Sequence, residues 1–228
     1  MSKNNILGIR FDDIGIAVAV ERSMRAMEER SGAYVVTLDS QLALEVRKNR
    51  RLTAAVKNAG LVLPGDKGIF TASYILGLPL RNKMDGLDYS AALLARMSET
   101  GRTMFILGAR PGVAERAAEE LMHRFPGIRL AGTTNGDFVD DTEIKKTINE
   151  LEPDLLIVCL SFPREELWMY ENCSELNIGI AVGLGRVMEP FMGRKDNSSW
   201  FSRLLHDPKR TLKEPRMALA AVKKRLLG

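Results

Sequence analysis

Residues 103–117, TMFILGARPGVAERA, decide the fold class, because they read as a buried strand, a glycine turn and the start of a helix. The strand part is apolar throughout and does not alternate, which is typical of a strand covered on both faces. The turn at Gly108 would let a phosphate approach backbone N–H groups at the positive end of the helix. A glycine turn serves packing equally well, and neither the dinucleotide fingerprint nor GxxxxGK[ST] is present. The stretch therefore predicts an α/β unit and leaves its ligand open.

Units of the same kind lie on both sides of this stretch. Short apolar runs alternate with longer segments of helical spacing, which predicts right-handed crossovers and a mainly parallel sheet with helices on both faces. The predicted strands are 33–38, 61–63, 103–107, 128–131, 154–160 and 178–182. The predicted helices are 40–58, with Ser40 as a possible cap, 111–123 and 164–176. We expect one doubly wound, Rossmann-like α/β domain over residues 1–192 and a basic helical appendage over residues 193–228.

Composition predicts a cytoplasmic globular protein. The 228 residues are 45% apolar and 27% charged, and no apolar run approaches the roughly 18 residues that a membrane span needs. Arg10, Asp12 and Asp13 interrupt the N-terminal apolar stretch, so it lacks the core of a signal peptide. The two cysteines have no metal-ligand spacing, and we interpret them as packing residues.

The charge distribution points to a local binding surface. Residues 193–228 carry ten Lys/Arg and three Asp/Glu, whereas residues 1–192 carry 23 and 26. The excess positive charge is confined to the tail, which argues against a general affinity for nucleic acid. Basic residues alternate there with Trp200 and several leucines, a pattern typical of a helix that lies on an anionic membrane surface. The alternative is a helix that docks on the domain or on a neighbouring subunit of a homo-oligomer.

Candidate binding residues follow the predicted strands. Ligands of such sheets bind beyond the carboxyl ends of the strands, where glycines and small polar residues gather in 64–68, 107–110, 132–138, 161–166 and 183–186. Asp66 is placed to act as a general base toward a hydroxyl, although an Asp there also fits a helix cap. The sequence has no Asp-x-Asp pair to bind a metal. A leaving diphosphate would therefore need helix N-termini and cations such as Arg110, Arg164, Arg186, Arg194 and Lys195.

Five segments, in this order, resemble the WecG/TagA/CpsF glycosyltransferase family over about residues 5–216. They are LPGDKGIFTAS (63–73), GLD (86–88), FILGARPGVAERAA (105–118), FPGIRLAGTTNGDF (125–138) and DLLIVCLSFPREELW (154–168). The resemblance implies an inverting hexosyltransferase that needs neither metal nor cofactor. It would move an N-acetylmannosamine-type sugar from a UDP donor to polyprenyl-diphosphate-linked N-acetylglucosamine at the inner face of the cell membrane. The product would feed teichoic acid or another cell-surface polymer.

The resemblance also assigns residues to roles. It gives three catalytic positions: Asp66 as the base, Thr37 near the sugar, and Asp39. The positions implied for substrate binding are Lys83, Gly108, Ala109, Gly132, Gly136, Asp137, Pro163, Glu165, Gly185, Arg186 and Glu189. Trp200, Arg203 and Arg210 match the tail motif, which is expected to contact the membrane and the acceptor.

Several positions depart from the family pattern. This chain has Asp39 where the family has Asn, Asp137 where it has Tyr and Glu165 where it has Gln, and the Arg-Ala-Pro motif is absent. A carboxylate beside a diphosphate is repulsive unless a cation accompanies it, and Arg164 and Arg186 are candidates for that cation. Two alternatives to an active transferase follow: a catalytically silent relative that binds a nucleotide sugar or a partner enzyme, and a scaffold that associates with the membrane through its tail.

Overall fold

Six strands form one sheet in which all neighbours run parallel. The computed structural model describes residues 3–82, 84 and 86–184. In spatial order the strands are β4 (Leu61–Pro64), β3 (Ala33–Leu38), β8 (Ile180–Gly183), β7 (Leu155–Cys159), β5 (Thr103–Gly108) and β6 (Arg129–Thr134). Each of these strands was predicted, with ends that differ by up to three residues. The expected doubly wound, parallel α/β fold is therefore confirmed for the described part of the chain.

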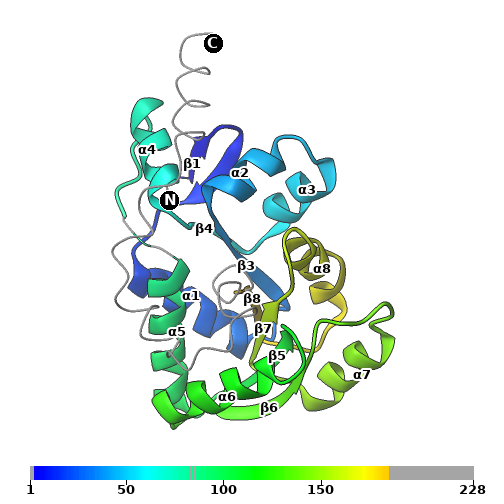
Figure 1. The fold of residues 1–228 in the computed structure, drawn as a ribbon. Helices are drawn as coiled ribbons and strands as arrows, with labels where there is room; N and C mark the ends of the chain where they lie inside the picture. Colours follow the sequence, from blue (N-terminus) through cyan, green and yellow to red (C-terminus); the bar gives the residue numbers. More distant parts are fainter. Residues whose placement is uncertain (1–2, 83, 85, 185–228) are drawn as a thin grey trace.

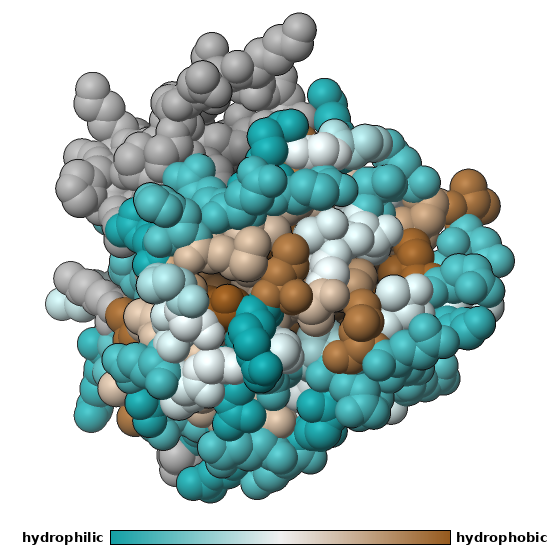
Figure 2. Space-filling model, turned by 90° about the horizontal axis from the view of Figure 1, so that it is seen from below, coloured by the Kyte–Doolittle hydropathy of each residue, from teal (hydrophilic) through white to brown (hydrophobic). Residues whose placement is uncertain are grey.

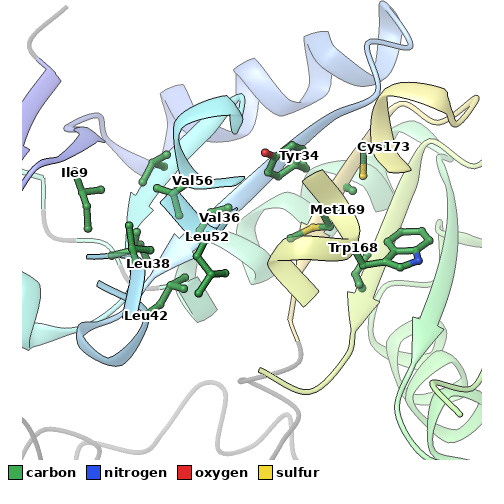
Figure 3. Packing of buried hydrophobic residues seen from close by; sticks show 14 of the residues in the cluster. Ile9, Tyr34, Val36, Leu38, Leu42, Leu52, Val56, Trp168, Met169 and Cys173 are labelled. Atoms are coloured by element: carbon green, nitrogen blue, oxygen red, sulfur yellow. The ribbon is translucent and has the colours of Figure 1, made fainter. Parts of the chain in front are cut away.

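Helices cover both faces of the sheet (Figure 1). One face packs against α2 (Ser40–Val46), α3 (Arg50–Asn58), α7 (Thr142–Leu151), α8 (Arg164–Asn172) and the 3-10 turn η1 (Cys173–Glu175). The other face packs against α1 (Ile16–Glu28), α5 (Gly86–Thr100) and α6 (Val113–Arg124). Figure 3 shows the first core, where Val36 and Leu38 of β3 lie near Leu42 and Leu52. Two separate cores explain why the strands are apolar on both sides.

A hairpin precedes the sheet and was not predicted. Strands β1 (Lys3–Ile6) and β2 (Ile9–Asp12) pair antiparallel around Leu7 and Gly8, which have φ of 56° and 88°. Two central residues with positive φ are typical of a tight hairpin turn. Leucine is unusual at the first of these positions, which is why the turn was not predicted from the sequence. The short helix α4 (Lys67–Ile75) lies beside this hairpin in Figure 1, and Ile69 packs into the same core as Ile6.

The single helix expected over residues 40–58 was wrong. The chain forms α2 and α3 instead, because Asn49 has extended backbone angles and its side chain accepts hydrogen bonds from Arg51 N and Leu52 N. The expected Ser40 cap was also wrong. Asp39 is the N-cap of α2, and its carboxylate accepts from Leu42 N. An Asn or Asp side chain that can cap the following turn competes with a continuous helix, and here it starts a new one.

The face of the molecule seen in Figure 2 is largely hydrophilic. Figure 2 shows apolar residues reaching the surface mainly in a hollow across the middle of one face, with hydrophilic residues around it. Such hollows are typical of surfaces that bind a ligand or a partner. Among the described residues, no helix has both the length and the apolar character needed to cross a bilayer.

Candidate active site

The crevice between β5 and β7 is the place where this topology predicts a ligand. The two strands are neighbours, but the chain leaves β5 toward α6 on one face and leaves β7 toward α8 on the other. Their loops therefore diverge at the carboxyl edge of the sheet. In open α/β sheets such a divergence is where ligands bind.

The turn after β5 has an unusual backbone. Gly108 and Ala109 have φ of +116° and +62°, and Ala109 N donates a 2.8 Å hydrogen bond to Cys159 O at the end of β7. A Cβ at Gly108 would collide with the Cys159 carbonyl, so only glycine fits this position. Ala109 keeps a left-handed conformation that costs energy for a residue with a side chain. Such strain is concentrated at ligand sites, which fits the expected role of both residues.

The loop after β6 closes onto this turn. Gly136 N donates to Ala109 O at 2.8 Å, and a Cβ at Gly136 would lie 3.2 Å from Leu160 Cδ2 and 3.3 Å from Gly108 Cα. The structure therefore brings Gly108, Ala109 and Gly136 together, as the sequence predicted. Gly132 lies elsewhere: it is inside β6, where a Cβ would approach the Phe105 ring at 2.8 Å. Packing against the Phe105 ring explains why residue 132 is a glycine.

Arg164 holds the loop after β6 in place. Its guanidinium donates to Gly136 O at 2.9 Å and to Phe138 O at 2.8 Å, and it stacks over the Phe138 ring at 4.2 Å from the centroid. A planar fork suits two carbonyls and a ring at once. The sequence offered Arg164 as a cation for the diphosphate or as compensation for Glu165. In the structure the guanidinium binds two carbonyls of this loop, and its role as a cation stays a prediction.

The two carboxylates near this loop differ in exposure. Glu165, in the first turn of α8, is 5% exposed, whereas Asp137 is exposed. Burial raises the pKa of the Cys159 thiol, and the nearby charge of Glu165 raises it further. The Glu165 carboxylate also abuts Gly183 at the end of β8. Glu165 is thus buried against the ends of β7 and β8, while Pro163 is the N-cap residue of α8.

A second cluster follows β3 and β4, where Ser40 joins the two strand ends. Asp66 Oδ1 accepts from Ser40 Oγ at 2.8 Å and from Ile69 N at 3.0 Å, and Oδ2 accepts from Ser40 N at 3.0 Å. Asp66 is therefore the N-cap of α4, as the alternative interpretation proposed, and it also satisfies the first N–H of α2. Its carboxylate is half-buried and oriented by three donors at the carboxyl edge of the sheet. A cap and a base are compatible roles for such a group.

Thr37 meets the beginning of α5. It pairs with Leu63 across β3 and β4, and a Cβ at Gly86 would lie 2.9 Å from Thr37 Cβ. The glycine of the Gly86-Leu87-Asp88 segment thus allows α5 to start against the threonine. Asp39 lies two residues after Thr37, where its carboxylate caps α2. The three predicted catalytic residues are therefore neighbours at one corner of the sheet.

The two clusters lie at the same edge of the sheet, after different strands. Four strand spacings separate β4 from β5, which corresponds to about 19 Å at ~4.8 Å per spacing. β8 ends between them, at Gly183. We call the region around Gly108, Ala109 and Gly136 the glycine crevice. A ligand that reaches from it to Asp66 must be extended, as a nucleotide sugar together with an acceptor would be.

Some predicted residues lie outside the described part of the chain. They are Lys83, Gly185, Arg186, Glu189, Trp200, Arg203 and Arg210, together with the appendage 193–228. Within residues 3–82, 84 and 86–184, no group of three or more His, Cys, Asp and Glu side chains could hold a metal ion. Metal-independent catalysis stays a prediction.

The sequence did not predict the contact between Ser40 and Asp66. Its hydroxyl and its amide both bind Asp66, and only the pairing of β3 with β4 brings residues 26 positions apart into contact. The available signal was that Ser40 follows Asp39, which itself comes directly after a strand. That signal was interpreted as a helix cap.

Known proteins resemble this chain over most of its length. The sequence profile described as the glycosyl transferase WecG/TagA/CpsF family matches residues 4–227. A Bacillus spizizenii protein is 28% identical over 209 residues, covering 86% of this chain and 81% of that protein. A Staphylococcus aureus protein (strain MW2) is 26% identical over 220 residues, covering 92% of this chain and 87% of its own length. Both relatives are named N-acetylglucosaminyldiphosphoundecaprenol N-acetyl-beta-D-mannosaminyltransferase.

Proposed function

Because this chain belongs to the WecG/TagA/CpsF glycosyltransferase family, we propose that it transfers N-acetylmannosamine from a UDP donor to N-acetylglucosamine linked to a polyprenyl diphosphate. The names of the relatives supply the sugar and the acceptor. The placement of the two clusters at one edge of the sheet supports this assignment, since the glycine crevice suits the nucleotide and the Asp66 cluster suits the reacting sugars. Transfer to the lipid-linked acceptor would serve a cell-surface polymer such as teichoic acid.

The observation that carries the proposal is the orientation of Asp66. Within the described residues, Oδ2 accepts one hydrogen bond, from Ser40 N, so this oxygen retains an acceptor site for a substrate hydroxyl. Asp66 would take the proton of the acceptor hydroxyl as its oxygen attacks the anomeric carbon. The bond from that carbon to the UDP oxygen breaks, and the electron pair leaves with UDP. Attack opposite the leaving group inverts the anomeric centre.

The glycine crevice would bind the nucleotide. The α6 N-terminus follows the Gly108-Ala109 turn, and its positive end favours the charge of a diphosphate. Gly136 and the loop held by Arg164 would border the same ligand. The buried Glu165 opposes a diphosphate, and a cation bound with the donor or supplied by Arg186 would offset it.

The direct test is Asp66→Asn. We expect transfer from UDP-N-acetylmannosamine to a lipid-linked N-acetylglucosamine to fall at least about 10³-fold, while calorimetric UDP binding in EDTA stays near wild type. Asp140→Asn is the matched control, because Asp140 is an exposed carboxylate that also accepts from a helix-start amide, Thr142 N. Normal turnover by Asp66→Asn would remove Asp66 from the mechanism.

The same assay also tests the silent-relative alternative. A wild-type protein that binds UDP but transfers no sugar, with folding and acceptor quality verified, would support that alternative. Glu165→Gln would then be the variant to assay, because it restores the neutral amide that the family pattern has.

The location of the reaction is a further proposal. The basic segment 193–228 and the lipid nature of the acceptor support attachment to the anionic inner face of the cell membrane. Self-association through the apolar residues of the tail is also proposed. Truncation after Gly193 should lower binding to anionic liposomes, and equal binding would refute the role of the tail.

A further inference from the structure

Helix α4 presents a fixed apolar surface next to the proposed base. We propose that Tyr74 and Leu78, with Lys67 and Arg81, form a second membrane-contact surface that rests on an anionic lipid bilayer. We call these four residues the α4 surface. This inference rests on the proposed function, because it assumes an acceptor embedded in that bilayer.

The apolar exposure on α4 is large for so short a helix. The inner side packs into the core through Ile69 and Ala72, which are 0% exposed. Tyr74, in the last turn of α4, is 79% exposed, and Leu78, three residues beyond the end of the helix, is 44% exposed. Figure 1 places α4 beside β1, beyond the layers that cover the sheet. Its outer side therefore faces away from the core.

The backbone holds these side chains in place. Gly77, with φ of 72°, ends the helix: Gly77 N donates to Tyr74 O at 3.0 Å and Leu78 N to Ser73 O at 2.9 Å. Ser73 Oγ then accepts from Leu80 N at 3.2 Å, and Leu80 is buried. The exposed tyrosine and leucine thus belong to a rigid, anchored turn. A rigid apolar projection loses little conformational entropy on binding.

Charge selects a lipid surface as the occupant. Residues 67–82 contain two cations, Lys67 and Arg81, and no Asp or Glu. Both cations are exposed, and they flank the apolar turn in sequence. Tyrosine is favoured where a protein meets the headgroup region, and Lys/Arg are attracted to anionic lipids. A surface that combines an exposed tyrosine, an exposed leucine and two cations matches an anionic bilayer better than it matches an apolar protein partner.

The position of the α4 surface suits the lipid-linked acceptor. Asp66 caps α4, and Tyr74 follows it by eight residues, which corresponds to about 12 Å along the helix axis. A sugar and a diphosphate together span a distance of this order. An acceptor whose sugar reaches Asp66 would therefore have its lipid chain near Tyr74, where the bilayer would begin.

The test is flotation of the full-length protein with vesicles of phosphatidylglycerol and phosphatidylcholine. We expect Tyr74→Ser/Leu78→Ser to lower the partition coefficient about tenfold. The matched control is Leu151→Ser/Tyr170→Ser, the same chemical change at side chains that are 43% and 36% exposed on α7 and α8. It should float like wild type. Lys67→Gln/Arg81→Gln should weaken flotation with anionic vesicles and leave binding to pure phosphatidylcholine unchanged.

Kinetics separate this surface from the proposed function. Tyr74→Ser/Leu78→Ser should retain wild-type kcat/KM with a water-soluble acceptor that carries a short prenyl chain, and lose most of it with a long-chain acceptor in vesicles. If the wild type transfers to neither acceptor, the proposed function fails, and flotation still tests the surface. Wild-type flotation of the double variant would overturn the α4 surface, as would loss of a dimer in the variant without any change in flotation.

Discussion

Arg164→Lys keeps the positive charge at this position but removes the planar fork that holds the loop after β6. The wild-type guanidinium makes two hydrogen bonds of 2.9 and 2.8 Å to loop carbonyls and stacks on Phe138. Each charged hydrogen bond contributes roughly 1.5–3 kcal/mol, and the stacking contributes about 0.5–1 kcal/mol. Lysine can replace one bond, so we expect the ordered loop to lose about 2 kcal/mol.

Amide exchange of the free protein measures this loss directly. The reporter is Gly136 N, which donates to Ala109 O. A loss of about 2 kcal/mol corresponds to roughly 30-fold faster exchange. If the loop borders the nucleotide, calorimetry should show UDP binding about 10- to 30-fold weaker in Arg164→Lys, and weaker again in Arg164→Met.

The control for the arginine is Arg129→Met. Arg129 is also an arginine that donates to a carbonyl, Gly101 O at 3.1 Å, but it lies at the first residue of β6, away from the carboxyl edge. It should leave UDP binding unchanged. Unaltered exchange at Gly136 in Arg164→Met would refute the idea that Arg164 holds the loop after β6 in place. Weak UDP binding together with unaltered exchange would instead indicate that Arg164 contacts the diphosphate directly.

Three further predictions test other parts of the structure. Gly108→Ala should cost at least about 3 kcal/mol of unfolding free energy in chemical denaturation, because its φ is +116° and a Cβ would strike the Cys159 carbonyl; a smaller loss would mean that the turn can relax. Asp13 is partly buried, which alone would raise its pKa, but hydrogen bonds from Asn82 and Arg81 outweigh this and lower it. The stabilisation that Asp13 contributes to folding is therefore present above the unfolded pKa of about 3.9 and is lost as pH falls through the folded pKa. Asp13→Asn should have a lower unfolding free energy than wild type at pH 7 and should lose less of it on acidification. Burial raises the pKa of the Cys159 thiol well above normal and that of Cys173 to about 12, so both should resist iodoacetamide at pH 8 in the native protein and react once unfolded, as mass spectrometry would show.

The fold class was predictable because local patterns encode it. Apolar runs that do not alternate indicated strands with two covered faces, and the two cores on either side of the sheet are the reason. Glycines after strands pointed to Gly108 and Gly136, which the structure brings into contact. Gly132 shows the limit of that inference, since a glycine inside a strand looks the same in sequence and serves packing against Phe105.

Contacts between distant segments required the tertiary structure. The strand order placed β8 between β3 and β7, and it separated the glycine crevice from the Asp66 cluster by four spacings. Ser40 meets Asp66 because β3 and β4 end side by side, and Arg164 reaches the loop after β6 from the start of α8. Residue type and spacing determined which groups were available for chemistry. Which of them meet was decided by the packing of strands far apart in the chain, because hydrogen bonds and apolar contacts between elements carry no local sequence signal.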